Sequence, residues 1–399
     1  MNISLASKLK FKLIAGLVFI AVLFASCDKN YEEPFETTYL EEYNDIQNLT
    51  KPQVLSLLQQ SDIFPSYASL LVKYGVKAIK IEYKTVDLNN EAITASGLIL
   101  IPVTSNQVPV LSFQHGTIFN EAAAPSHYQS DFTDMLTIMA STGYAILVPD
   151  YLGYGSSSQI AHPYEHRSSL ATACRDMIRA GYEYFIVAPG TNRSSKLFLA
   201  GYSEGGFATM ALFKMLQEDN STELAVSGVS VGAGAYNKTQ FAKHITAQNA
   251  PSTYINYFLW VMLTYNSIYV DLQRPVSHYI NSPWAEQIAS NGPFTQVESN
   301  PSILFQTNFV ESISNETDAA FLAALADNDC YNWKPLSPLM MIHGTADELV
   351  PIFNSQTAYD AMLTNGAENI TFTQVPDGTH DSVVAKFAMD TFGFFEGLK

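Results

Sequence analysis

Basic side chains are scarce in this sequence of 399 residues. It carries 21 Lys and Arg residues against 38 Asp and Glu, which gives a formal net charge of −17 at pH 7. A surface that binds phosphates needs a stripe of positive charge. The composition therefore argues against a nucleic-acid partner, and it equally disfavours electrostatic docking on an anionic membrane.

Cysteine is also rare, and the patterns that hold metal ions are missing. Neither C-x-x-C nor H-E-x-x-H occurs, so the sequence indicates no metal site. Of the three cysteines, Cys27 lies near the N-terminus, whereas Cys174 and Cys330 are far apart in the chain. In an oxidising compartment these two could form a disulfide, but two buried thiols are equally compatible with the sequence.

The first 27 residues have the pattern of an export signal. Lysines at positions 8, 10 and 12 precede an apolar run from Leu13 to Ala25, and small residues follow before Cys27. This run is too short for a comfortable membrane span, so residues 1–26 are predicted to be a signal peptide. Because LFAS stands directly before the cysteine, the segment resembles a bacterial lipoprotein signal, which implies that Cys27 is lipidated. An ordinary cleaved signal and an uncleaved anchor are the alternatives.

A lipid on Cys27 would hold the exported protein on a bacterial membrane, at its periplasmic side or at the cell surface. The acidic stretch DKNYEEPFETTYLEEYN predicts a tether over residues 27–50. With 47% apolar and 15% charged residues, the chain as a whole is typical of a globular protein.

The order of apolar segments predicts an α/β fold with a mostly parallel sheet. VKAIKIEYKTVD and EAITASGLILIP alternate apolar and polar residues on either side of LNN, which is typical of an antiparallel hairpin. Six short apolar runs then alternate with helical segments, as expected for parallel strands covered by helices on both faces. These runs are VPVLSFQ, GYAILVPD, KLFLAGY, VSGVSVGAG, PLMMIHG and NITFTQVPD.

A long insert interrupts this alternation over residues 236–335. It exceeds an ordinary connection many-fold, so it must have structure of its own. Its centre, TYINYFLWVMLTYNSIYV, is aromatic and uncharged. This stretch is short and polar for a transmembrane helix, which favours a buried helix of a cap or lid. The sheet domain is accordingly expected over 51–235 and 336–399, with the helical cap between the two parts.

A serine stands between two glycines where an apolar strand gives way to a helix. Gly201, Ser203 and Gly205 form G-x-S-x-G, the pattern of a strained turn that lifts a nucleophilic hydroxyl above a sheet. The alternative is an ordinary glycine-rich connection between a strand and a helix. The motif gains weight only if an acid, a histidine and an oxyanion site accompany it.

An acid and a histidine follow in the required order. Asp347 comes after the strand MMIHG, and His380 comes after the last strand of the sheet. The carboxyl ends of parallel strands meet at one edge, so Ser203, Asp347 and His380 are expected to converge there as nucleophile, acid and base. Asp347 could instead be only a turn residue, in which case Asp377 or Asp381 would be the acid.

Two backbone N–H groups are predicted to stabilise the oxyanion. One belongs to Glu204, directly after the nucleophile, and the other to Thr117 in the loop HGT, for which Gly116 is the alternative. His115 is expected to brace this loop. The Glu204 side chain is expected to face solvent or to make a local hydrogen bond.

Aromatic residues near these segments are predicted to line a substrate pocket. They are Tyr151, in the glycine-containing loop that follows GYAILVPD, Tyr202 beside the nucleophile, and Trp260 in the insert.

Taken together, ASGLILIP, QHGT, VPDYLGYGSS, GYSEGG, HGTADELVP and DGTH resemble the α/β-hydrolase superfamily over residues 76–399. P-D-Y-x-G and the large insert before the acid strand resemble its secreted lipase and esterase branch, whose founding members are fungal lipases of the lipase A type. The resemblance implies hydrolysis of small-molecule or lipid carboxylic esters through an acyl-serine, an acyl pocket under a lid, and no metal or organic cofactor.

Two other functions compete with ester hydrolysis. HGTADELVP and the glycine pair after the serine also occur in prolyl-oligopeptidase-like peptidases, although the segment before QHGT is too short for their large N-terminal domain. A non-catalytic surface binding lipoprotein is the other alternative. Such proteins typically lose a member of the triad, whereas all three residue types are present here.

Overall fold

A mixed sheet organises the structure. The computed structural model describes residues 35–61, 66–188, 190 and 192–399, and Thr37–Lys399 form one compact unit. Within these residues nine strands pair in the order β1-β2-β3-β5-β4-β6-β7-β8-β9. The strands are β1 (Leu40–Leu49), β2 (Val76–Val86), β3 (Ala92–Pro102), β4 (Val108–Gln114), β5 (Ala145–Pro149), β6 (Arg193–Tyr202), β7 (Val226–Gly232), β8 (Leu339–Gly344) and β9 (Ile370–Val375).

Strand directions agree with the sequence pattern. The pairs β1–β2, β2–β3 and β3–β5 are antiparallel, and all pairs from β5–β4 to β8–β9 are parallel. The predicted hairpin joins β2 and β3, and the six predicted runs are β4 to β9. The predicted fold class, a mostly parallel sheet with antiparallel first strands, is confirmed.

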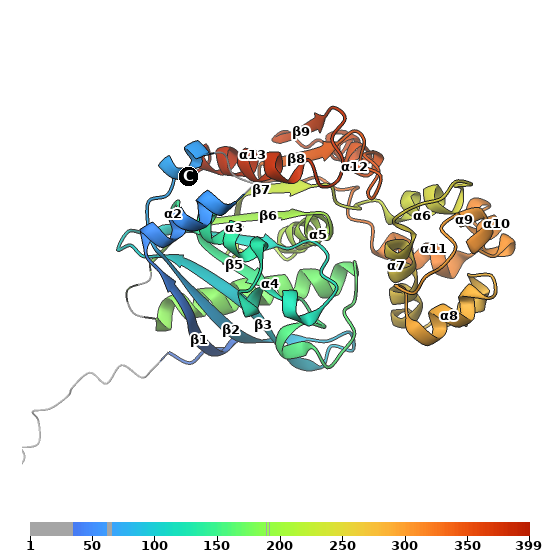
Figure 1. The fold of residues 1–399 in the computed structure, drawn as a ribbon, viewed down its shortest axis with the longest axis horizontal. Coiled ribbons are helices and arrows are strands. Elements are labelled where there is room, and N and C mark those ends of the chain that lie inside the picture. The colour runs from blue at the N-terminus through green and yellow to red at the C-terminus, as the bar shows by residue number, and fades with distance from the viewer. Residues whose placement is uncertain (1–34, 62–65, 189, 191) are drawn as a thin grey trace, which may run out of the picture. The chain divides into compact units, whose positions relative to one another are not determined.

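Helices cover both faces of the sheet because alternate strand residues point to opposite sides. On β6, Leu197 and Leu199 belong to the core under α4 (Arg167–Val187), α5 (Glu204–Glu218) and α12 (Phe353–Thr364). Their neighbours Phe198 and Ala200 belong to the core on the other face. That face is covered by α2 (Lys51–Gln60), α3 (Asp131–Ala140) and α13 (Val384–Glu396) (Figure 1).

Strand β1 corrects the expected extent of the acidic tether. Residues 27–50 were predicted to form a tether, but Leu40–Leu49 pair with β2 along the edge of the sheet. The sequence of β1 hides this strand because only Leu40 and Leu49 are buried and the eight residues between them are exposed. Besides its pairing with β2, the start of the strand has a polar anchor: Glu183 on α4 accepts hydrogen bonds from the backbone N–H groups of residues 38–40.

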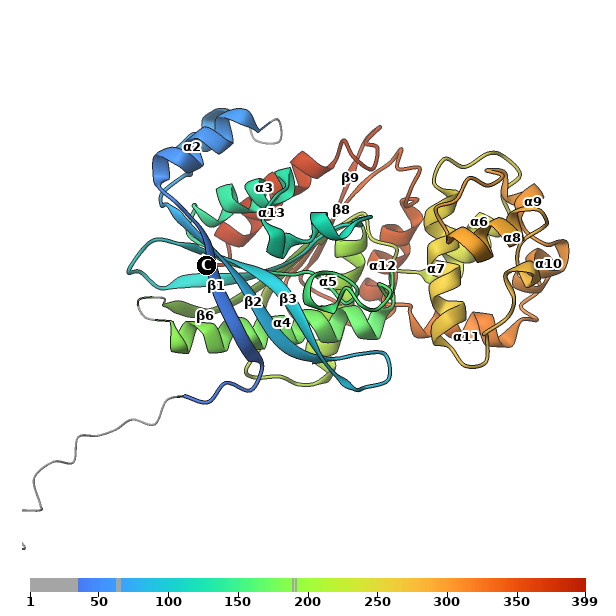
Figure 2. The same cartoon turned by 60° about the horizontal axis from the view of Figure 1, so that its bottom comes forward.

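The insert folds into six helices, counted within the described residues, that share a core of their own. Figures 1 and 2 both show this group beside one end of the sheet. Its core includes Leu259, Tyr265, Ile313 and Phe321, none of which belongs to the two sheet cores. The helices are α6 (Lys238–Thr246), α7 (Ile255–Ile268), α8 (Trp284–Asn291), α9 (Pro301–Leu304), α10 (Thr307–Ser314) and α11 (Ala319–Asp327).

The structure answers two questions that the sequence left open, one about a membrane-spanning helix and one about a disulfide. No helix in the described part of the chain is long and apolar enough to cross a membrane, and α7 accounts for the aromatic stretch of the insert. Cys174 and Cys330 are both buried free thiols, which decides between the two alternatives that the sequence left open. Cys27 and the signal segment lie outside the described residues.

Candidate active site

Ser203 occupies a strained turn between β6 and α5. Its backbone has φ 61° and ψ −125°, a conformation that residues other than glycine rarely adopt. The N–H of Ser203 donates a hydrogen bond to the carbonyl of Gly232 at 2.9 Å. A strained residue that persists at a strand end is held by its surroundings. This turn has the geometry that G-x-S-x-G predicts.

Close packing explains the two glycines of the motif. A Cβ at Gly205 would come within 2.0 Å of the carbonyl oxygen of Gln114, at the end of the neighbouring strand β4. A Cβ at Gly201 would lie 2.2 Å from the carbonyl oxygen of Gly205. Larger residues at either position would push α5 away from the sheet and move Ser203 with it.

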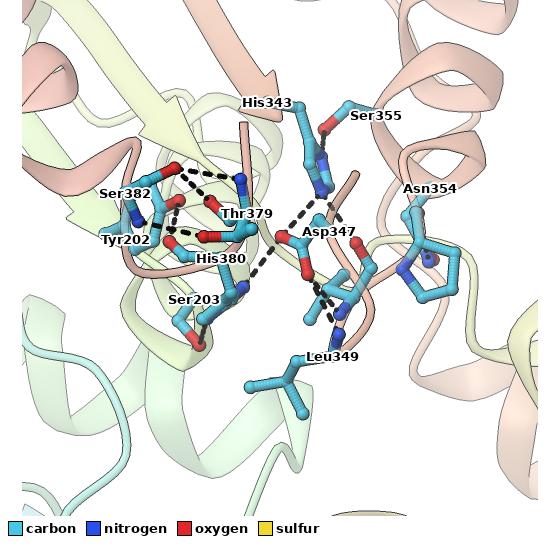
Figure 3. A network of polar contacts seen from close by, with 12 residues as sticks. Tyr202, Ser203, His343, Asp347, Leu349, Asn354, Ser355, Thr379, His380 and Ser382 are labelled. Atoms are coloured by element: carbon cyan, nitrogen blue, oxygen red, sulfur yellow. Dashed lines mark hydrogen bonds and ion pairs between the residues drawn. The ribbon is translucent and has the colours of Figure 1, made fainter. Parts of the chain in front are cut away.

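Ser203, His380 and Asp347 are connected by hydrogen bonds (Figure 3). The Nε2 atom of His380 lies 2.9 Å from the Oγ of Ser203, and its Nδ1 lies 2.7 Å from the Oδ2 of Asp347. Because the carboxylate can only accept, Nδ1 carries a proton, which leaves Nε2 of a neutral ring free to accept the serine proton. The structure thus brings together the three residues that the sequence singled out.

Asp347 is the acid that contacts His380; neither Asp377 nor Asp381 forms a hydrogen bond or an ion pair with this ring. Its Oδ1 accepts hydrogen bonds from the backbone N–H groups of Leu349 (3.0 Å) and Val350 (2.8 Å), which fix the carboxylate. Burial works to raise its pKa. The hydrogen bonds from His343 and His380 outweigh burial and bring the pKa of Asp347 down to about 2.

A second histidine contacts the same carboxylate, and sequence reasoning missed it. His343 is fully buried, and its Nε2 lies 3.2 Å from the Oδ2 of Asp347 and 2.7 Å from the carbonyl oxygen of Val350. Both neighbours are acceptors, so Nε2 carries the proton and donates to them. The other ring nitrogen lies 2.7 Å from the Ser355 hydroxyl. The spacing H-G-x-x-D, four residues apart in one turn, is the signal that could have indicated this contact.

The predicted oxyanion loop lies against the nucleophile. A Cβ built on Gly116 would be 3.7 Å from the Cβ of Ser203, so the backbone of this loop passes close to it. The Thr117 hydroxyl forms a hydrogen bond with the Tyr164 hydroxyl at 2.9 Å, whereas no described residue accepts a hydrogen bond from the Thr117 N–H. Glu204 is the first residue of α5, so its N–H has no acceptor within that helix.

The Glu204 side chain corrects the expectation of a solvent-facing or locally bonded group. It is only 2% exposed, and its Oε1 lies 2.8 Å from Nε2 of His162. The other ring nitrogen of His162 lies 2.7 Å from the Leu152 carbonyl, which accepts its proton. One further proton is therefore shared between the carboxylate and Nε2, and the pair is neutral overall. Sequence reasoning could not find it because 42 residues separate the partners.

Two cavities meet at Ser203. The first, here called the cap cavity, has a volume of about 80 Å³ and is lined mostly by apolar residues of the insert, among them Phe241, Val261 and Phe309. The second, here called the rim cavity, has a volume of about 440 Å³ and is lined by residues from the oxyanion loop, α3, α13 and the His380 loop. Ser203, Tyr257 and Leu349 line both cavities, whereas His380 lines only the rim cavity.

Of the aromatic residues predicted to line a substrate pocket, Tyr202 lines a cavity and Trp260 does not. Tyr202 lines the rim cavity, and its hydroxyl donates to the carbonyl of His380 at 2.7 Å. Trp260 is not among the lining residues of either cavity, but its ring stacks at 4.0 Å on Tyr164, which does line the cap cavity.

Tyr151 does not line either cavity, which corrects the predicted pocket. Its side chain is fully buried, its ring stacks on His115 at 4.1 Å, and its hydroxyl donates to the His115 carbonyl at 2.9 Å. His115 in turn contacts the carbonyl oxygens of Gly116 and Asp150, so it braces the oxyanion loop as expected. Burial lowers the pKa of His115, which keeps this ring neutral.

Metal ligation has no basis in the described residues. Among them, no group of three or more His, Cys, Asp or Glu side chains is arranged to hold a metal ion. The ionisable residues beside Ser203 are instead engaged in hydrogen bonds to one another, as described for Asp347 and Glu204.

A sequence model of the secretory lipases matches residues 121–390, which is more than half of the chain. This chain belongs to the secretory lipase family. Ser203, Asp347 and His380 fall within the matched region, and the oxyanion loop lies just before it. Membership confirms the resemblance to the secreted lipase and esterase branch.

Individual relatives extend the comparison. The secreted triacylglycerol lipase LIP2 of Malassezia furfur is 25% identical over 322 residues, which cover 74% of this chain and 65% of that lipase. The chain spans less than two thirds of the length of the curated secretory lipases it matches, 65% of one and 62% of another.

Solved structures confirm the α/β-hydrolase fold. A rice cell wall degrading esterase, LipA of Xanthomonas oryzae, superposes with a TM-score of 0.77 at 23% identity, over 90% of this chain and 99% of the esterase. Lipase A of Candida antarctica superposes with a TM-score of 0.61 at 19% identity, over 87% of this chain and 78% of that lipase. At these identities the likeness concerns the fold that this secretory lipase family member shares with them.

Proposed function

We propose that this chain hydrolyses carboxylic esters through an acyl-serine intermediate. The observation that carries the proposal is the series of hydrogen bonds from the Ser203 hydroxyl through His380 to Asp347, at the junction of two cavities. Membership of the secretory lipase family supports the same reaction.

In the acylation step, the Oγ of Ser203 attacks the ester carbonyl carbon while Nε2 of His380 takes the serine proton. The negative charge on the carbonyl oxygen is stabilised by the backbone N–H groups of Glu204 and Thr117. Asp347 keeps the imidazole in the tautomer with a proton on Nδ1 and stabilises the positive charge that forms on the ring. The bond from the acyl carbon to the alcohol oxygen then breaks, and His380 protonates the departing alcohol.

Deacylation repeats these steps with water. His380 takes a proton from a water molecule, whose oxygen attacks the acyl carbon of the intermediate. When the new tetrahedral intermediate collapses, the proton returns to Ser203 and the carboxylic acid leaves. The cycle needs no group beyond the three side chains and the backbone donors.

The cap cavity is the proposed acyl site. Its lining is mostly apolar, as an acyl chain requires, and its two charged side chains, Glu165 and Lys238, are buried as an ion pair with each other. The Lys238 ammonium also lies 3.9 Å from the centroid of the Phe207 ring. Because these charges are compensated locally, an uncharged chain can enter without leaving an unpaired ion in the cavity.

The direct test is a series of p-nitrophenyl esters from acetate to palmitate, assayed with the native protein and with Ser203→Ala. We expect the native protein to cleave at least part of the series and Ser203→Ala to lose nearly all activity. Ser290→Ala, which alters an exposed serine of α8, is the matched control and should keep full activity. Full activity of Ser203→Ala in a correctly folded sample would contradict the proposal.

The same samples separate ester hydrolysis from its alternatives. A preference for prolyl or aminoacyl amides over esters would favour a peptidase. Failure of Ser203 to react with a fluorophosphonate, together with no turnover of any ester, would favour a non-catalytic binding protein.

We also propose that the chain is exported and anchored through a lipid on Cys27. The support is the sequence pattern of lysines, apolar run and small residues before this cysteine. Metabolic labelling with a fatty-acid analogue in a bacterial host should label the native protein and not Cys27→Ser. Equal labelling of both would contradict the anchor.

A further inference from the structure

The two cavities at Ser203 are not equivalent for the chemistry. In the proposed reaction the departing alcohol oxygen must receive its proton from Nε2 of His380. His380 lines the rim cavity and not the cap cavity. The acyl group stays bonded to Ser203, whereas the alcohol must leave along the side where His380 lies. The rim cavity is therefore the side of the alcohol.

The charged groups of the rim cavity have one sign. Asp131, at the start of α3, and Asp381, next to His380, both line it, and both are exposed. Among the described residues that line this cavity none is Lys or Arg. On α13, the ammonium of Lys386 lies 2.8 Å from the carboxylate of Asp390 and is not part of the lining. An anionic alcohol would meet two carboxylates there and find no cation.

Uncharged polar groups add hydrogen-bonding capacity to the same cavity. Most of the lining is apolar, but Thr117 and Ser130 contribute hydroxyl groups, which also pair with Tyr164 and Thr133. The two carboxylates can accept hydrogen bonds from hydroxyl groups of a ligand. With about 440 Å³, the rim cavity is also more than five times as large as the cap cavity, at about 80 Å³. The rim cavity therefore offers more room for a bulky alcohol than the cap cavity does.

We propose that the rim cavity binds the alcohol part of the ester and selects uncharged, hydroxyl-rich alcohols over anionic ones, through Asp131 and Asp381. The inference rests on the proposed ester hydrolysis and adds the class of alcohol to it. Selection arises from repulsion of an anionic group by the two carboxylates, while hydroxyl groups of a polyol donate hydrogen bonds to them.

Two substrates with the same acyl chain test this selection. 1-Butyrylglycerol carries an uncharged polyol, and 1-butyrylglycerol 3-phosphate carries the same polyol with an anionic group. We expect kcat/KM of the native protein to favour the uncharged ester by about tenfold at low salt. Because both carboxylates are exposed, the preference should shrink at high salt.

A pair of double variants assigns the effect to these residues. Asp131→Asn/Asp381→Asn should reduce the preference for the uncharged ester by about three- to fivefold. Asp134→Asn/Asp377→Asn removes the same charge from the same two segments outside the cavity lining and should leave the preference unaltered. Thermal unfolding of each variant confirms that it is folded.

Three results would overturn the inference. Equal kcat/KM for the two esters would show that the rim cavity does not select by charge. A preference that both double variants reduce equally would assign it to the overall net charge of the protein. No turnover of any ester would remove this inference together with the proposed function. If p-nitrophenyl esters are cleaved but the two butyrylglycerol esters are not distinguished, only the inference fails and the proposed function stands.

Discussion

The cap cavity and the rim cavity share Ser203 but are formed by different parts of the chain. Helices of the insert form most of the cap cavity, and its lining is mostly apolar. Loops at the carboxyl end of the sheet, together with α3 and α13, form most of the rim cavity, which carries His380 and two carboxylates. In the proposed reaction the sheet domain therefore supplies the reacting groups, whereas the insert supplies most of the acyl site and contributes only Tyr257 to the rim cavity.

The largest effect is expected on the sheet side, at Asp347. Asp347→Asn keeps the shape of the side chain but favours the wrong tautomer of His380, so kcat should fall about 10⁴-fold. Asp377→Asn is the matched control in the loop that carries His380. Because Asp377 is exposed, we expect its substitution to alter kcat by less than about twofold. Stopped-flow or steady-state assays with one ester measure both. A comparable loss in both variants would mean that Asp347 has no special role.

The low pKa of Asp347 predicts an acid-labile contribution to stability on the same side. Its pKa in the folded protein is about 2, below the ordinary value of 3.8, so the unfolded chain binds this proton more readily. The ionised carboxylate of Asp347 therefore stabilises the folded protein fully above pH 3.8, and this stabilisation is lost as the pH falls from 3.8 to about 2. Between these limits the free energy of unfolding of the native protein should fall by about 2 kcal/mol more than that of Asp347→Asn. Denaturant unfolding at several pH values measures it, and parallel curves would contradict the assignment.

A substitution in the cap cavity should change selectivity for the acyl chain. Val261→Phe narrows the cavity, and we expect the ratio of octanoate to acetate turnover to fall about tenfold. Val270→Phe makes the same change at a residue that is 77% exposed, and it should preserve the ratio. Competition between the two p-nitrophenyl esters measures the ratio directly. An unchanged ratio in Val261→Phe would place the acyl chain elsewhere.

The smallest effect on kcat is expected from the side chain of Glu204, which lies behind the proposed oxyanion site. Glu204→Ala removes the partner of His162 and should lower kcat about fivefold with little change in KM, since it loosens the start of α5. Glu204→Gln can donate a hydrogen bond to the neutral ring of His162 and should recover most of the loss. An equal loss of kcat in Glu204→Ala and Glu204→Gln would contradict this account, because it would mean that the negative charge of Glu204, and not only its hydrogen bond to His162, is required.

The strands, and the meeting of Ser203, Asp347 and His380, could be predicted because their signals are local. Short apolar runs identify β4 to β9, and the residues just after β6, β8 and β9 include Ser203, Asp347 and His380. Parallel strands bring their carboxyl ends to one edge, so these residues could be expected to meet.

The features that were missed depend on contacts between distant segments. β1 is exposed along most of its length, and Glu183 on α4 holds its first residues. The neutral pair of Glu204 and His162 and the burial of Tyr151 likewise arise only when separate loops pack together. No periodic pattern in the sequence marks such contacts, which is why these residues were missed or placed wrongly.

The central claim is that Ser203 is acylated with the acyl chain in the cap cavity and the alcohol in the rim cavity. A crystal structure of the protein after reaction with a p-nitrophenyl octylphosphonate that also carries a glyceryl ester tests both parts at once, because p-nitrophenolate leaves and the octyl and glyceryl groups stay on phosphorus. The account predicts phosphorus bonded to the Oγ of Ser203, the octyl chain against Val261 and Phe309, and the glyceryl group near Asp131 and Asp381. An adduct on another residue, or the two groups in exchanged cavities, would contradict it.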